Sequence, residues 1–128
     1  MSAAPKTRPK YYDLNLAHLP PPGLVSIFHR ISGALLFFPA LPLALYILHV
    51  SLGSQEGYER WAAFFTRPAV KLIVILAAWG YAHHFFAGIR YLLLDLHIGI
   101  EKAPARASAV AVLVAGFLAA LAFAWCIW

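Results

Sequence analysis

Three long stretches without a charged residue set the fold of this 128-residue chain. They run between Arg30 and Glu56, between Lys71 and Arg90, and from Ala107 to Trp128. A membrane-crossing helix needs about 20 apolar residues, because each residue advances ~1.5 Å through a hydrocarbon core of ~30 Å. The first and third stretches meet this length, and Lys71 and Arg90 can reach the headgroups from the ends of the second. The pattern predicts an all-α membrane protein with three transmembrane helices, near 24–51, 69–95 and 106–127.

The basic residues are divided unevenly between the two sides of these helices. Lys6, Arg8 and Lys10 precede the first helix, Arg90, Lys102 and Arg106 flank the second connection, and Arg60, Arg67 and Lys71 belong to the other side. Short loops rich in Lys and Arg stay on the cytoplasmic side. We therefore expect a multi-pass protein of a bacterial inner membrane, with a cytoplasmic N-terminus and a periplasmic C-terminus. Because the net charge of +5 lies at membrane boundaries, nucleic acid is not an expected partner.

The remaining segments fit one membrane-anchor domain over residues 1–128. Residues 1–23 are polar and proline-rich, and we expect a cytoplasmic arm there. Pro39 and Pro42 predict a kink in the first helix. The connection over 51–68 mixes aromatic and charged residues, so we expect it to lie along the membrane interface. The connection over 96–105 is short and makes the second and third helices antiparallel neighbours. Cys126 is the single cysteine, which excludes an internal disulfide.

Polar residues in the first helix form the first candidate site. Ser26, His29, Arg30 and Gly33 stand at i, i+3, i+4 and i+7 and so share one helical face. An arginine inside a membrane costs about 3 kcal/mol on insertion scales, and it faces protein, water or a charged ligand. We therefore expect this face to meet protein, water or a charged ligand and not lipid.

The second candidate site is His84 in the second helix. Gly80 and Gly88 lie four residues to either side of His84, and Ala87 lies three residues after it, which leaves space on its face. Such space serves either close helix packing or a flat cofactor whose metal takes the imidazole. The neighbouring His83 points ~100° away, toward bulky residues, and is expected to be hydrogen-bonded or to support the site indirectly.

The two sites should lie at similar depth, because consecutive transmembrane helices run in opposite directions. Ser26, Arg30, Arg90 and the histidines would then converge on one pocket. Two guanidinium groups beside a histidine indicate an anionic or electron-rich ligand, and haem propionates meet that description.

At these residues the chain resembles the cytochrome b membrane-anchor subunit of succinate dehydrogenase. The resemblance covers nearly the full length. It rests on Arg8-Pro9, on Ser26-Ile27-x-His29-Arg30-x-Ser32-Gly33, on the segment 54–58, and on His84-x-x-x-Gly88-Ile89-Arg90 followed by Asp95. Many relatives have histidine after Gly-Ile-Arg, whereas this chain has Tyr91, so a role of that position in propionate binding or proton relay is not carried over.

The resemblance implies a haem b shared with a companion anchor subunit, with His84 as one axial ligand of its iron. The companion subunit would provide the other ligand, and together the two chains would form a heterodimeric anchor bundle. His29 and Arg30 would contact the propionates, while Ser26 and Arg30 would line a ubiquinone site near the iron–sulfur subunit. The chain would thereby anchor the iron–sulfur and flavoprotein subunits and pass electrons to ubiquinone, without being catalytic alone.

Three alternatives remain open from the residues. Asp95 is a candidate for proton delivery to the quinone, or for an ion pair or docking contact at the helix end. The chain could instead anchor a quinol:fumarate reductase, which runs the same chemistry in reverse. It could also be a haem-free structural or regulatory membrane protein whose buried polar groups join helices.

Overall fold

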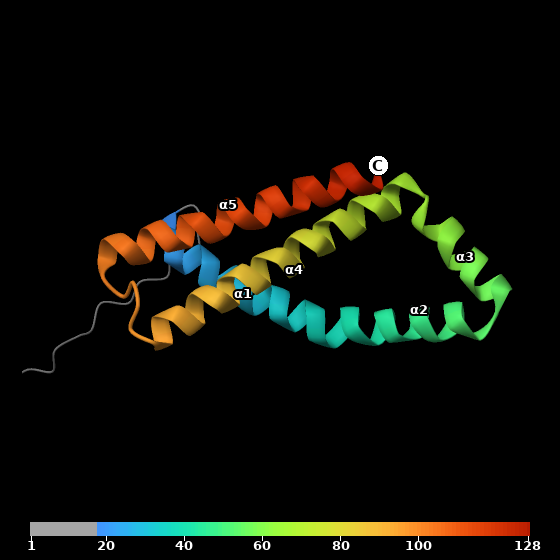
Figure 1. Ribbon diagram of the computed structural model, residues 1–128, viewed down its shortest axis with the longest axis horizontal. Helices are drawn as coiled ribbons and strands as arrows, with labels where there is room; N and C mark the ends of the chain where they lie inside the picture. The colour runs from blue at the N-terminus through green and yellow to red at the C-terminus, as the bar shows by residue number, and fades with distance from the viewer. Residues whose placement is uncertain (1–17) are drawn as a thin grey trace, which may run out of the picture.

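The computed structural model describes residues 18–128, and all regular structure in this part of the chain is helical (Figure 1). The elements are α1 (Pro21–Leu35), the π-helical turn η2 (Leu36–Ala40), α2 (Leu41–Gly53), α3 (Gln55–Phe65), α4 (Pro68–Asp95) and α5 (Lys102–Ile127). Three continuous helical stretches in the described residues are long and apolar enough to cross a membrane: Pro21–Gly53, Pro68–Asp95 and Lys102–Ile127. The prediction of an all-α protein with three transmembrane helices is confirmed. Most of the expected arm, including Arg8 and Pro9, lies outside the described residues.

Two helices begin earlier than the sequence pattern indicated. The first begins at Pro21 rather than near residue 24, because proline is accommodated in a first turn, where the backbone N–H has no partner within the helix. α5 begins at Lys102 rather than near 106, with Pro104 in its first turn for the same reason. The expected distortion at Pro39 takes the form of the π-helical turn η2, after which the helix continues as α2.

All three transmembrane segments meet at one end of the molecule, where α1 lies (Figure 1). α4 and α5 run side by side in opposite directions, and α1 packs against both of them (Figure 1). The core of this packing consists of Val25, Ala87, Ala109 and Val112. On α5, Gly116 lets the backbone of His83 approach so closely that an added Cβ would lie 3.3 Å from its Cα. Small residues at the contact thus bring helices together where no hydrophobic effect drives association.

α2 has a different environment from α1. It diverges from α4 (Figure 1) and contains no buried residue, and its leucines are largely exposed, with Leu45 at 57% and Leu48 at 53%. In a membrane such a surface faces lipid or another transmembrane subunit. The described chain therefore presents a long apolar surface on one side of its bundle.

Two short connections fix the order of the helices. Ser54 caps α3 by accepting a hydrogen bond from the backbone N–H of Gly57 at 3.0 Å. Along α3, Trp61 contacts both Phe64 and Phe65 and reaches Tyr46 of α2, an aromatic cluster suited to a membrane interface. Between α4 and α5 the chain reverses through His97 (φ 62°) and Gly99 (φ 74°). This tight reversal makes α4 and α5 antiparallel neighbours, as expected.

Candidate functional site

The two histidines predicted to share a site are in direct contact. His29 of α1 and His84 of α4 stack with ring centroids 4.3 Å apart and planes at 10°. The ring of Tyr91 packs against His29, with the two ring centroids 5.1 Å apart. The prediction that these parts of the first and second transmembrane helices lie at the same depth is therefore correct.

The backbone of α1 holds the ring of His84 in one orientation. Nδ1 of His84 lies 3.1 Å from the carbonyl oxygen of His29, and 3.3 Å from the hydroxyl of Ser32. That hydroxyl also donates to the His29 carbonyl at 3.1 Å. Because a carbonyl can only accept, we assign the proton of the neutral imidazole to Nδ1. Nε2 then carries the lone pair, which is the protonation state a metal-ligating histidine needs.

A glycine on α1 makes this contact possible. A Cβ at Gly33 would lie 2.9 Å from Cε1 of His84, so the ring occupies the space that a side chain would take. A Cβ at Gly88 would lie 3.9 Å from Nε2 of His29. The space predicted beside His84 at Gly88 is thus bordered by the His29 ring, whereas Gly80 has no heavy atom within 4 Å of an added Cβ.

Ser26 and Arg30 lie on the same helix as His29. Ser26 is half-buried, Arg30 is exposed, and neither side chain forms a hydrogen bond with a residue in the range 18–128. They are one helical turn apart, so a hydroxyl and a guanidinium project from neighbouring positions on α1. Both groups are available to a ligand.

Arg90 does not join this site, and the expected convergence is wrong for that residue. Its side chain is 6% exposed and points to α5, where Nε donates to the hydroxyl of Ser108 at 3.0 Å and Nη2 to the carbonyl of Ala105 at 3.2 Å. Six residues separate Arg90 from His84, which rotates it about 240° around the helix. The guanidinium therefore belongs to the contact between α4 and α5.

His83 is packed behind the site. It is completely buried, with its ring 5.8 Å from that of Phe28 and 5.7 Å from that of Trp79. The bulky surroundings predicted for it are present, but the expected hydrogen bond is not. The backbone carbonyl of Val25 lies nearby, yet neither ring nitrogen has a partner in hydrogen-bonding geometry among the described residues.

Asp95 ends α4 and is exposed. It forms no ion pair with any residue of the described part of the chain. A basic partner within residues 18–128, one of the alternatives for this carboxylate, is therefore not seen. Its side chain is free to meet another protein or solvent at the membrane surface.

Ser32 was not predicted to have a role. It is 7% exposed and makes both of the side-chain contacts described above. It lies three residues after His29, on the side of α1 that also carries buried Val25 and meets α4. Its spacing from Val25 and His29 was the signal in the sequence that could have placed Ser32 at this contact.

No group of three or more His, Cys, Asp or Glu side chains in the described residues could hold a metal ion.

Together, the fold and this pair of histidines define a small three-span membrane protein with a histidine pair stacked between α1 and α4 and an exposed arginine on α1. Residues 4–123 match the model of the family described as succinate dehydrogenase/fumarate reductase transmembrane subunit. The chain is also 39% identical over 123 residues to the succinate dehydrogenase cytochrome b556 subunit of Coxiella burnetii, covering 94% of this chain and 97% of that relative.

This chain belongs to the succinate dehydrogenase/fumarate reductase transmembrane subunit family. It is a multi-pass membrane-anchor subunit of the succinate dehydrogenase type, and its partners are the other subunits of that complex.

Proposed function

We propose that this chain binds a haem b through His84 and helps to form a ubiquinone site with Ser26 and Arg30. The observation that carries the haem assignment is the fixed ring of His84, whose Nδ1 is held by the His29 carbonyl so that Nε2 keeps its lone pair. The relative from Coxiella burnetii is named a cytochrome b556 subunit, which supports a haem in this chain as well. His83 offers no such geometry, because it is enclosed by α1, Trp79 and α5.

The residues around His84 suit a haem bound between two subunits. His84 is the single histidine of the described chain positioned in this way, so a companion anchor subunit would provide the second axial ligand. His29 and Arg30 would contact the propionates, since one borders His84 and the other carries an unpaired guanidinium. The haem, when bound, would accept and return single electrons between the iron–sulfur subunit and the quinone.

Ser26 and Arg30 have the chemistry that quinone reduction requires. The serine hydroxyl can donate a hydrogen bond to a carbonyl oxygen of ubiquinone, and the guanidinium of Arg30 stabilises negative charge that develops on that oxygen. Asp95, exposed at the end of α4, would deliver protons from the cytoplasmic side or contact a soluble subunit. This assigns binding and charge stabilisation to the chain and leaves succinate oxidation to the flavoprotein subunit.

The proposed assembly places the chain in a bacterial inner membrane with its N-terminus in the cytoplasm. The companion subunit would cover part of the exposed apolar surface of α2, and the iron–sulfur and flavoprotein subunits would dock on the cytoplasmic side. The basic residues at the ends of α4 and α5, Arg90, Lys102 and Arg106, support this orientation.

Substitution of the two adjacent histidines in the four-subunit complex tests the haem assignment. His84→Leu should abolish or severely disturb the α and β bands of the dithionite-reduced low-spin haem, whereas His83→Leu should leave them largely unchanged. The reverse result would move the ligand to His83. A wild-type complex without these bands would remove the haem altogether and favour a structural subunit.

Ser26→Ala and Arg30→Leu test the quinone assignment. Each should lower ubiquinone reductase activity while succinate oxidation by an artificial acceptor stays near the wild-type rate. An equal loss of both activities would indicate failed assembly rather than a damaged quinone site. Because the matched family includes fumarate reductase subunits, the rate of fumarate reduction by quinol in the same preparation distinguishes the second candidate, an anchor of a quinol:fumarate reductase.

A further inference from the structure

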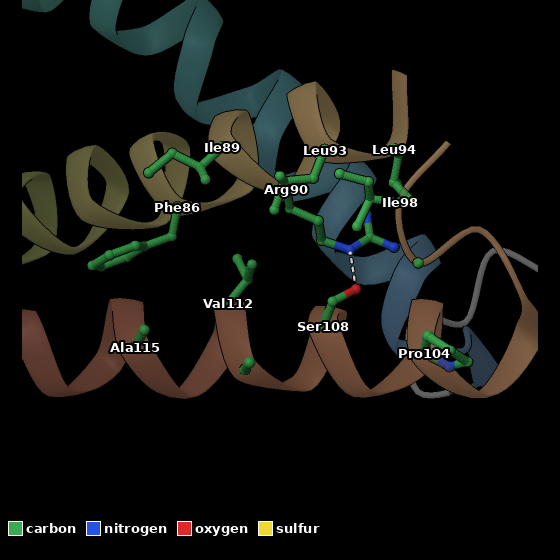
Figure 2. A pocket seen from close by; sticks show the side chains of 12 residues that line it. Phe86, Ile89, Arg90, Leu93, Leu94, Ile98, Pro104, Ser108, Val112 and Ala115 are labelled. Atoms are coloured by element: carbon green, nitrogen blue, oxygen red, sulfur yellow. Dashed lines mark hydrogen bonds between the residues drawn. The ribbon is translucent and has the colours of Figure 1, made fainter. Parts of the chain in front are cut away.

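An open trough lies between α4 and α5, away from the stacked histidines. It has a volume of about 350 Å³ and is formed almost entirely by apolar side chains (Figure 2). The lining from α4 includes Phe86, Ile89 and Leu93, and the lining from α5 includes Ala111 and Ala115. Only Arg90 and Ser108 contribute polar side chains. A cavity of this size accommodates a small-molecule ligand or part of a larger one.

Arg90 gives this trough a positive charge, and its guanidinium lies 5.4 Å from the centre of the Tyr91 ring. No carboxylate among residues 18–128 pairs with it, and its hydrogen bonds to Ser108 and Ala105 are made with neutral oxygen atoms. Nη1 forms no hydrogen bond with a described residue. A buried cation is costly unless it meets an anion, and a guanidinium pairs especially well with phosphate. Within the described residues, the guanidinium of Arg90 therefore has no anionic partner.

Arg90 lies at the edge of the hydrocarbon core, close to the level of lipid headgroups. The 28 residues of α4 span about 42 Å, whereas the hydrocarbon core is ~30 Å thick, so about 6 Å extends beyond the core at each end of a centred helix. Arg90 lies five residues before the last residue of α4, or ~7.5 Å along its axis. The guanidinium is therefore at the boundary between acyl chains and headgroups. Its contacts with α5 fix the guanidinium at this boundary, just below the level of the lipid phosphates.

We propose that the trough between α4 and α5 binds an anionic phospholipid, with its phosphate on Arg90 and an acyl chain along the apolar lining. Charge complementarity identifies this occupant: a single cation at the boundary between acyl chains and headgroups lies at the end of an otherwise apolar trough. Exposed lining residues on its outer side, with Ile89 at 42% and Leu93 at 43%, leave the trough open to lipid. This site is separate from the positions on α1 where Ser26 and Arg30 lie.

Mass spectrometry of the intact four-subunit complex, purified in mild detergent and titrated with lipid, tests this site. Wild-type complex should retain phosphatidylglycerol in preference to phosphatidylcholine of the same acyl chains. Arg90→Gln should weaken that retention at least tenfold. The matched control is Arg106→Gln, which removes an exposed charge located two residues before Ser108 and about 200° around α5, and it should bind lipid like wild type.

A second variant keeps the proposal testable if Arg90→Gln fails to assemble. Ala111→Phe fills the trough from an exposed lining position and leaves Arg90 intact, and it should also reduce retention of phosphatidylglycerol. Millimolar inorganic phosphate should not displace the lipid, because the acyl chain contributes to binding. The proposal is overturned if Ala111→Phe binds lipid like wild type, if the two lipids bind equally, or if phosphate alone displaces the lipid. Unchanged binding by Arg90→Gln would likewise show that Arg90 has another partner in the complex.

Discussion

Gly33→Ala should weaken haem binding without preventing the chain from folding. The added Cβ would lie 2.9 Å from Cε1 and 3.4 Å from Nδ1 of His84, so the ring would have to move by several tenths of an ångström. Without haem the half-buried ring is held only by the hydrogen bond to the His29 carbonyl and by stacking on His29, so it can shift more easily. With haem bound, the proposed bond to iron and the hydrogen bond to the His29 carbonyl hold it in place. The strain therefore appears in the affinity for haem.

The expected size of the effect follows from the cost of overpacking. Adding a methyl group to a well-packed contact costs about 1–3 kcal/mol, which corresponds to a roughly 5- to 150-fold weaker affinity for haem. The haem content of the purified complex and the rate of haem transfer to an apoglobin measure this change. Gly53→Ala is the matched control, because an added Cβ there meets no heavy atom within 4 Å. If Gly33→Ala and Gly53→Ala bind haem equally well, His84 does not ligate iron in the orientation described.

Three further predictions concern individual side chains. Ser32→Ala removes an acceptor near Nδ1 of His84, and since a hydrogen bond is worth about 1 kcal/mol, the haem midpoint potential should rise by up to ~40 mV. A potential unchanged in redox titration would show that Ser32 does not act on the ring. His83→Leu replaces a buried ring that lacks hydrogen-bond partners, so the thermal midpoint of the complex in detergent should not fall. A fall of several degrees would reveal a partner for His83 in the assembled complex. Ser54→Ala removes the cap of α3 and should cost about 1 kcal/mol locally, seen as roughly fivefold faster amide exchange at the start of α3; unaltered exchange would mean that the cap is dispensable.

The transmembrane helices could be predicted from the sequence because the signal for them is local. A run without charge specifies a span wherever it occurs, and neighbours add little to that requirement. The helix ends were harder to predict, since Pro21 and Pro104 are compatible with a loop and equally with a first turn. Whether each proline lies in a loop or in a helix depends on how the residues after it pack.

Side-chain direction explains what the sequence did not reveal about the site. The proximity of His29 and His84 follows from antiparallel helices, and the bulk around His83 follows from spacing along α4. Ser32 and Arg90 depend instead on which face of α1 or α4 meets which neighbour. That choice is made by the close packing of α1, α4 and α5 around Val25 and Ala87, which is a property of the three helices together.

The contact between His29 and His84 also explains why this chain would provide only half of a haem site. Gly33 leaves the space that the His84 ring occupies, so the two helices stabilise one ring orientation and leave one nitrogen of His84 for a metal. The described residues contain no group of three or more His, Cys, Asp or Glu side chains that could hold a metal, while the adjoining α2 offers an unburied apolar surface to another helix. A companion subunit that packs on this surface could bring the missing ligand, and the shared haem would then stabilise the pair of subunits. In this arrangement haem loading and subunit assembly are linked, so a variant that weakens either should weaken both.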